Sequence, residues 1–166
     1  MKILIAYISQ TGNTKKVAEA IYSAIPEPKE IKRLEDVKSL ESYDLSFLGF
    51  PIHASGPDKK AKTVLERYTK NRSIALFITH MSPEYAKELP GWIQKFRDAA
   101  VGANCLGVFD CQGQGSALIK FVMRIAPNPQ IRKFAKLDNS RGQPDSARLE
   151  RAKIFANEIM NKISSP

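Results

Sequence analysis

The sequence predicts an α/β protein built on a doubly wound parallel sheet. Short, nearly uninterrupted apolar runs alternate along the chain with segments whose apolar residues recur at helical spacing. Strands that helices bury on both faces have this continuous apolar character. The 166 residues, 43% of them hydrophobic, can bury one substantial core, so we expect a single domain over residues 1–166.

The first half of the chain predicts three strands. The expected elements are, in order, a strand 2–8, a helix 13–25, a weak strand 29–34, at most a short helix 36–40, and a strand 43–50. The first strand ends in a polar cluster, and the helix after it has its apolar residues three and four positions apart. Pro51 is expected to stop the third strand because proline has no N–H to donate to a ladder.

The second half adds two strands and most of the helices. The expected elements are a helix 59–68, a strand 73–79, a helix 91–101, a strand 104–110, a helix 116–126 and a closing helix 145–163. Pro90 suits the first turn of the third of these segments. Cys105 and Cys111 would lie about 20 Å apart on one strand, so they cannot form a disulfide with each other. We expect both to be small buried side chains in a reducing compartment.

The positive charge is concentrated in the last third of the chain. The formal net charge is +9, and residues 113–166 hold 10 Lys or Arg against 4 Asp or Glu. Such a balance favours acidic partners, nucleic acid or anionic membranes. Nucleic-acid binding is disfavoured because no strand interleaves aromatic with basic residues as a stacking platform.

The loop after the first strand is suited to holding an anion. It comprises Ser9, Gln10, Thr11, Gly12, Asn13 and Thr14. Its hydroxyl groups and the free N–H groups of the helix start can donate to a phosphate. The loop has no Lys and lacks both the nucleoside triphosphate motif and the three-glycine dinucleotide motif. An ordinary helix cap explains only part of this pattern. The sequence therefore predicts a site for a phosphomonoester held by amides and hydroxyls.

The segment IAYISQTGNTKKVA resembles the signature of the flavodoxin family. The residues at the family's spacing are Tyr7, Ser9, Gly12, Thr14 and Ala18. Ala6 departs from the pattern, in which a larger apolar residue is usual. The resemblance covers nearly the whole chain and implies a flavodoxin-like five-stranded parallel sheet of order 2-1-3-4-5 with helices on both faces. It also implies FMN as the cofactor, with its phosphate in this loop.

The resemblance further implies that two loops hold the flavin ring. By position these loops contribute Pro51, Ile52, His53, Ala54, Ser55 and Gly56 from the first, and Thr79, His80, Met81 and Tyr85 from the second. Tyr85 is the first candidate for stacking on the ring and Trp92 the second. The alternative for Trp92 is a core position in the helix after Pro90. The first loop has no aromatic residue, which departs from many flavodoxins.

Further residues of these loops bear on the flavin. His53 can stack or hydrogen-bond there and can change its charge between about pH 5 and 8, the alternative being a surface loop position. In flavodoxins a peptide of this loop flips to accept a hydrogen bond from the reduced flavin, and Gly56 would permit the flip here. After the fifth strand, Cys111, Gln112 and Gly113 allow a close approach to the pyrimidine side of the ring. No redox role is expected for Cys111.

Residues 113–137 form a basic amphipathic insert before the last helix. Residues 112–136 contain no Asp or Glu, and the run SALIKFVMRIA reads as a basic amphipathic helix that Pro127 and Pro129 end. Such a helix can lie on a membrane surface or dock onto an acidic partner. We therefore expect acidic redox partners or peripheral membrane contact through 116–136. The alternative is a helix packed across the sheet edge with its basic side in water.

These features together predict a cytoplasmic FMN protein that shuttles electrons between redox partner proteins. No apolar run of about 18 residues indicates a membrane span. The run LIKFVMRI also looks like an insert of the flavodoxin-like protoporphyrinogen oxidases, so a quinone-linked, FMN-dependent oxidoreductase is an alternative. No substrate base, nucleophile or metal ligand can be assigned. A non-enzymatic binding module with a basic surface is the second alternative.

Overall fold

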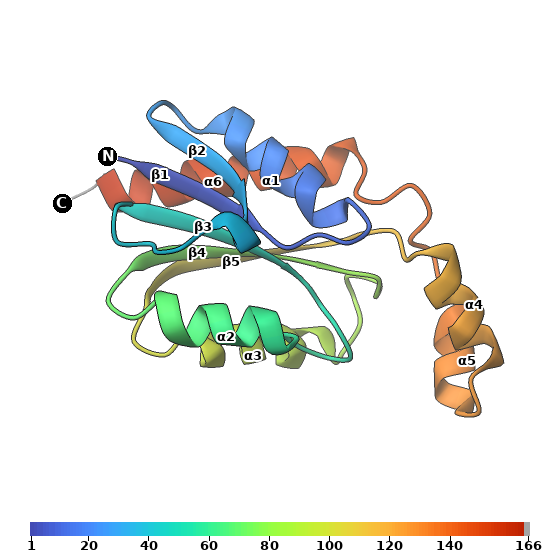
Figure 1. Cartoon of the computed structure of the whole chain (residues 1–166). Coiled ribbons are helices and arrows are strands. Elements are labelled where there is room, and N and C mark those ends of the chain that lie inside the picture. The colour runs from blue at the N-terminus through green and yellow to red at the C-terminus, as the bar shows by residue number, and fades with distance from the viewer. Residues whose placement is uncertain (165–166) are drawn as a thin grey trace.

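Five strands pair side by side in the computed structural model, which describes residues 1–164. The strands are β1 (Ile3–Tyr7), β2 (Lys29–Arg33), β3 (Leu45–Pro51), β4 (Ser73–His80) and β5 (Asn104–Gln112). All neighbouring pairs are parallel, and the order is β2-β1-β3-β4-β5 (Figure 1). The expected fold class and strand order are confirmed.

Helices cover both faces of the sheet (Figure 1). The helices of one face are α1 (Asn13–Ala24) and α6 (Ser146–Ser164), and those of the other are α2 (Lys59–Tyr68) and α3 (Leu89–Ala99). Ile21 and Ile159 are buried in the core between the sheet and the first pair. Leu65 and Phe96 are buried in the core between the sheet and the second pair. The sheet is therefore apolar on both faces, as the continuous apolar runs predict.

Several element boundaries differ from the expected ones for local reasons. In place of a short helix at 36–40, a single 3₁₀ turn η1 (Leu34–Asp36) follows β2. β3 ends at Pro51 as expected, with the proline itself as the last residue of the strand. Pro51 has no N–H to donate to a neighbouring strand. On the β1 side no acceptor is left waiting for it, because β1 ends at Tyr7, opposite Gly49. Tyr68, the last residue of α2, is 38% exposed.

The basic insert forms a helical hairpin that projects from the edge of the sheet (Figure 1). Its helices are α4 (Ala117–Ile125) and α5 (Pro129–Lys136). The sequence did not predict α5; Asn128 caps it by accepting from the Gln130 N–H at 2.8 Å, and Pro129 occupies its first turn. None of the residues of α4 is buried, and α4 lies against α5. The alternative of a helix packed across the sheet edge is therefore wrong.

Candidate functional site

Four loops meet at the carboxyl edge of the sheet, where doubly wound folds bind ligands. The Thr14 and Thr79 hydroxyls, which belong to α1 and β4, share a hydrogen bond of 2.9 Å. The Ile52 N–H, just after β3, donates to the Thr79 carbonyl at 2.8 Å. The Gly113 N–H, just after β5, donates to the His80 carbonyl at 2.8 Å. The structure therefore brings together, at this edge, the loops and element ends that contain the predicted site residues.

The loop between β1 and α1 leaves N–H groups at the helix start without a helical acceptor. Gly12 has a φ of +87° and stands at the N-cap position of α1, where L residues other than glycine are strained. The Ser9 hydroxyl accepts from the Gly12 N–H at 3.1 Å, which fixes the loop. The first helical hydrogen bond runs from the Lys16 N–H to the Gly12 carbonyl, so the preceding N–H groups of the first turn have no acceptor inside the helix.

Asn13 links this loop to the loop after β5. Its side-chain amide donates to the Thr11 hydroxyl and to the Gln114 carbonyl, both at 2.9 Å. A Cβ added to Gly113 would lie 2.8 Å from the Asn13 side chain. Gly113 is therefore required for this contact, and its function is close packing.

The predicted phosphate donors divide into exposed and buried groups. Gln10 and Thr11 are exposed, while Ser9, Gly12 and Asn13 are partly exposed. Thr14 is only 1% exposed, and its hydroxyl is engaged with Thr79 beneath the loop. The Thr14 side chain therefore supports the loop from below in this structure, whereas Thr11 lies at its surface.

The loop after β3 contains a strained turn. The His53 and Gly56 N–H groups donate to each other's carbonyls at 3.0 and 3.1 Å, which closes the turn around Ala54 and Ser55. The φ angles of Ala54 and Ser55 are 43° and 81°, so this is a type I′ turn with no glycine at its centre. The left-handed positions are thus not at Gly56, which instead lies close to the Lys95 side chain. The flip of a peptide in this loop stays a prediction.

His53 lies at the base of this turn. It lines an open hollow of about 470 Å³, together with residues of the turn and of α2 and α3. Its Nε2 atom is buried and has no hydrogen-bond partner among the described residues. The ring is therefore partly enclosed and is not a simple surface group.

The loop after β4 presents one aromatic ring to solvent. Tyr85 is 82% exposed, whereas Trp92 is partly buried near the start of α3. His80 is 4% exposed, and its ring nitrogens contact the Ser82 carbonyl at 2.9 Å and the Asp110 carboxylate at 3.1 Å. The His80 ring therefore supports the loop from within the protein. Tyr85 is the ring that is free to meet a ligand.

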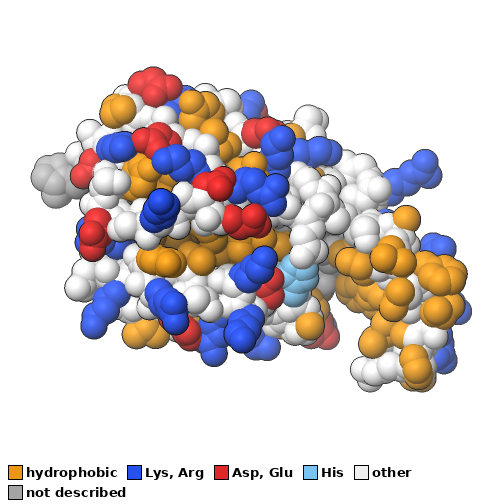
Figure 2. All heavy atoms as spheres, in the orientation of Figure 1, with side chains coloured by type: hydrophobic (Ala, Val, Ile, Leu, Met, Phe, Trp, Pro, Cys, Tyr) orange, Lys and Arg blue, Asp and Glu red, His pale blue; other side chains and the backbone are white. Residues whose placement is uncertain are grey.

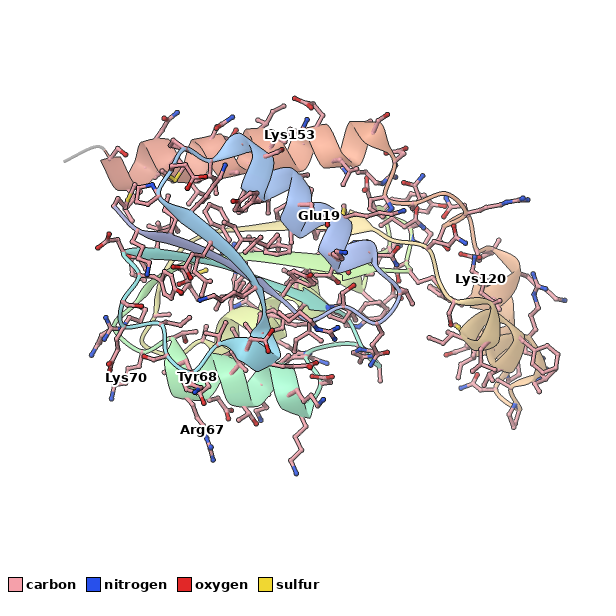
Figure 3. The ribbon with its side chains drawn as sticks, turned by 45° about the horizontal axis from the view of Figure 1, so that its top comes forward. Glu19, Arg67, Tyr68, Lys70, Lys120 and Lys153 are labelled. Atoms are coloured by element: carbon pink, nitrogen blue, oxygen red, sulfur yellow. The ribbon has the colours of Figure 1, made fainter. Side chains whose placement is uncertain are left out.

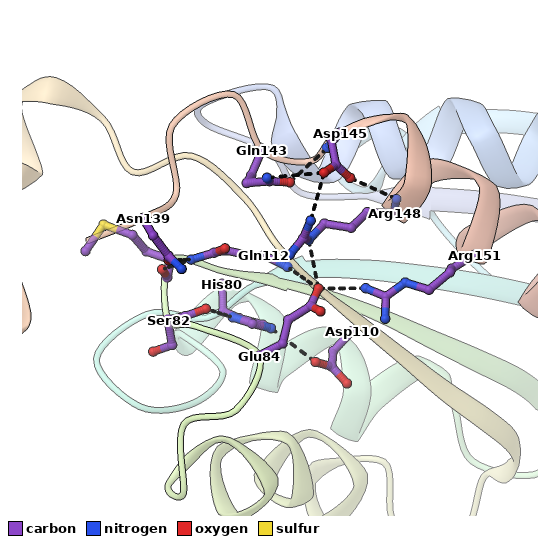
Figure 4. A network of polar contacts seen from close by, with 11 residues as sticks. His80, Ser82, Glu84, Asp110, Gln112, Asn139, Gln143, Asp145, Arg148 and Arg151 are labelled. Atoms are coloured by element: carbon purple, nitrogen blue, oxygen red, sulfur yellow. Dashed lines mark hydrogen bonds and ion pairs between the residues drawn. The ribbon is translucent and has the colours of Figure 1, made fainter. Parts of the chain in front are cut away.

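A polar network that the sequence did not reveal holds the same loop to α6 (Figure 4). The Glu84 carboxylate accepts from Arg148 at 2.8 Å and from Arg151 at 2.6 Å. Arg148 also donates to Asp145 at 2.9 Å. The pKa of Asp145 is lowered, first by its hydrogen bond from the Arg148 backbone N–H. Of the residues in this network, only Glu84 lies in a loop that the sequence analysis singled out. No sequence motif links Glu84 to arginines more than sixty residues away, so the network could not be predicted.

The predicted residues at the end of β5 have buried side chains. Gln112 is 2% exposed, and its amide donates to the Met81 carbonyl at 3.0 Å and to Asn139 at 2.7 Å. The Met81 sulfur lies so close to Gly115 that no Cβ fits there. Cys111 lies in the core, and burial, with Glu84 and Asp110 nearby, raises its pKa to about 12. Its thiol is therefore poorly reactive.

Comparison with known proteins agrees with this architecture. The family model of the flavodoxin domain matches residues 4–157. The chain belongs to the flavodoxin family. It is 36% identical over 175 residues to the flavodoxin-like domain-containing protein BilS of Clostridioides difficile (strain CD3), with 99% of each chain covered.

Solved structures give the same answer for the fold of this flavodoxin. A flavoprotein in complex with FMN from Lactobacillus acidophilus NCFM is 26% identical, with a TM-score of 0.54 and coverage of 66% of this chain and 92% of that one. Oxidised flavodoxin 2 from Bacillus cereus is 20% identical, with a TM-score of 0.64 and coverage of 98% and 99%. At that identity, the second likeness shows the fold alone.

The donor set of this flavodoxin fits a phosphomonoester. Backbone N–H groups at the start of α1 and the Thr11 hydroxyl are available at the surface, and the loop carries neither a carboxylate nor a basic side chain. Nothing lies within 4 Å of the position that a Gly12 side chain would take, so a ligand can approach the loop backbone closely.

Proposed function

We propose that this flavodoxin binds FMN and carries electrons between redox partner proteins. The observation that carries the proposal is the loop from Ser9 to Thr14 at the carboxyl edge of the sheet. Its left-handed Gly12 and the free N–H groups of α1 form an anion site without a counter-charge. FMN ends in a phosphomonoester, whereas FAD and nicotinamide cofactors carry a diphosphate.

The loops around that site would hold the flavin ring. The type I′ turn after β3 would flank one side, and the loop after β4 would flank the other with Tyr85. When bound, FMN supplies reversible electron uptake and release. The protein residues supply position: the Glu84 network and the buried His80 fix the loop that carries Tyr85 (Figure 4). A site held this firmly needs little rearrangement when the charge on the cofactor changes.

The carrier role is favoured over a stand-alone oxidoreductase by the groups at this edge. His80 is buried between Ser82 and Asp110, and Cys111 is a buried thiol with a raised pKa. Neither is placed to act as base or nucleophile on a substrate. The formal net charge of +9 supports acidic redox partners, because opposite charges speed the encounter of two proteins.

Stopped-flow redox assays on the FMN-loaded protein test the proposal. The flavin, reduced photochemically without oxygen, should be reoxidised by added one-electron acceptor proteins, and NADPH alone should not reduce it. The same protein is then mixed with protoporphyrinogen and a quinone. Turnover of the porphyrinogen would contradict the carrier function and favour the quinone-linked oxidoreductase. Failure to bind any flavin would contradict both functions and favour a non-enzymatic binding module.

A further inference from the structure

The outward face of α4 is an apolar surface that nothing in the described chain covers. Its large side chains are between 46% and 71% exposed: Leu118, Ile119, Phe121, Val122 and Ile125. Most of them are three or four positions apart, so they form one stripe along the helix. Figure 2 shows hydrophobic side chains gathered on this projecting part of the molecule. Such a contiguous exposed patch marks an interaction surface.

The hairpin that carries this face is positively charged. Lys120 is neutralised by Asp138 at 2.7 Å, and Arg132 donates to the Ala126 and Pro127 carbonyls at the end of α4. The other basic side chains of the hairpin form no ion pair among the described residues; they are Arg124, Lys133 and Lys136, all exposed. Residues 112–136 contain no Asp or Glu that would oppose them.

Charge and composition decide between the occupants that could cover the face. A second copy would bring the same uncompensated cations against each other, which disfavours a symmetric dimer. Surfaces that bind transient protein partners are about as polar as the rest of a protein surface. On α4, by contrast, no polar group interrupts the five apolar side chains on their side of the helix. An apolar helix face on a hairpin with exposed basic residues suits a bilayer surface that contains anionic lipid.

We propose that the α4–α5 hairpin docks this protein onto anionic lipid surfaces. The hairpin projects beyond the body of the protein, so α4 can meet a flat surface without obstruction (Figure 1). The base of the hairpin is closed by the Lys120–Asp138 ion pair and by the Gly115 N–H, which donates to the Ser140 hydroxyl at 3.2 Å. No helix of the described residues is both long enough and apolar enough to cross a bilayer, so the contact is peripheral.

Docking of this kind would bring the cofactor edge of the sheet toward the membrane. The hairpin follows β5 directly, and the Gln114 carbonyl at its base accepts from Asn13 in the phosphate loop. An electron acceptor at the bilayer surface would then lie on the same side as the flavin.

Flotation with lipid vesicles tests the apolar part of the proposal. The full-length protein is mixed with vesicles of phosphatidylcholine alone or with added phosphatidylglycerol, and bound protein is quantified on a gel. We expect binding only with phosphatidylglycerol, and a loss of at least about tenfold for Phe121→Glu. Val101→Glu is the matched control, because Val101 is an exposed apolar residue, 75% exposed, between α3 and β5. It should bind like the wild type.

A second pair of variants tests the charge. Lys133→Gln with Lys136→Gln should weaken binding about 10- to 30-fold at low salt, on the basis of roughly a fivefold effect per basic residue near an anionic surface. Arg67→Gln with Lys70→Gln removes the same charge from exposed residues at the far end of the molecule from Lys120 (Figure 3). This control should bind like the wild type.

The possible results separate the proposal from its rivals. Absence of wild-type binding to phosphatidylglycerol vesicles, or equal losses in the hairpin and control variants, would overturn it. A concentration-dependent dimer that Phe121→Glu dissolves would assign the face to a second copy instead. The assay detects protein and not flavin, so its result is independent of the proposed electron-carrier function.

Discussion

Replacing Gly12 with alanine tests how the phosphate loop works. Gly12 has a φ of +87°, and a Cβ added to it would meet no atom within 4 Å. The cost of the substitution is therefore conformational and not steric. An L residue in the left-handed region costs about 1–2 kcal/mol. The Gly12→Ala loop should relax away from the shape in which the first N–H groups of α1 converge.

FMN binding to the Gly12→Ala variant must then restore the original loop conformation, at the same cost in free energy. A penalty of about 1–2 kcal/mol corresponds to a roughly 5- to 30-fold weaker Kd for FMN. Gly102→Ala is the matched control. Gly102 has a φ of +78° at the opposite edge of the sheet, and its added Cβ would contact only the flexible Lys70 side chain at 3.3 Å. It should lower the free energy of unfolding by a similar amount and leave FMN affinity unchanged.

Two measurements on each variant decide the outcome. Quenching of FMN fluorescence gives the Kd, and urea unfolding of the flavin-free protein gives stability. Gly12→Asn should recover part of the affinity, because Asn tolerates the left-handed region better than Ala. Wild-type FMN affinity in Gly12→Ala, or an equal loss of affinity in Gly102→Ala, would refute the reasoning.

Three other predictions follow from buried or strained groups. Iodoacetamide at pH 8 should label Cys111 more slowly than the partly exposed Cys105, because burial raises the pKa of Cys111 to about 12. In urea the two cysteines should be labelled at equal rates. Mass spectrometry measures the extent of labelling at each cysteine. Burial raises the pKa of Asp138, but hydrogen bonds from Lys120 and a serine outweigh it and hold that pKa below 3.8. The ionised Asp138 therefore stabilises the folded protein above pH 3.8, and this stabilisation is lost as the pH falls further. At pH 7, Asp138→Asn should speed amide hydrogen exchange in the α4–α5 hairpin. Ser55→Gly should raise the free energy of unfolding in urea by up to about 1 kcal/mol, because Ser55 has a φ of 81°; a loss of stability would count against strain there.

Local sequence patterns predicted the elements that form the sheet. Four of the five strands coincide with apolar runs, the exception being β2, a strand of mostly charged residues. The segment 59–68 begins and ends where α2 does. Asp58 helps to explain that agreement, because its carboxylate accepts from the Ala61 N–H at 2.8 Å and caps the helix. The loop from Ser9 to Thr14 also lies between a strand and a helix start as expected, with Gly12 at the N-cap of α1, and its role as a phosphate site stays a prediction.

Long-range side-chain contacts could not be predicted in the same way. Glu84 meets Arg148 and Arg151 only because the fold brings the loop after β4 against α6. His80 lies in a predicted loop, but its burial depends on Asp110 across the β4–β5 ladder. The positive φ angles of Ala54 and Ser55 could not be predicted, because neither residue is a glycine, the residue type that usually adopts them. The sequence also did not predict α5, because Pro127 and Pro129 indicated only the end of the preceding helix.

Competition between FMN and riboflavin tests the central claim most directly. The two flavins share the isoalloxazine ring and differ in the phosphate, so their affinity ratio isolates the contribution of the loop from Ser9 to Thr14. The account predicts one FMN per protein and much weaker binding of riboflavin, with the difference reduced in Gly12→Ala. Equal affinity for the two flavins, or no binding of either, would contradict it.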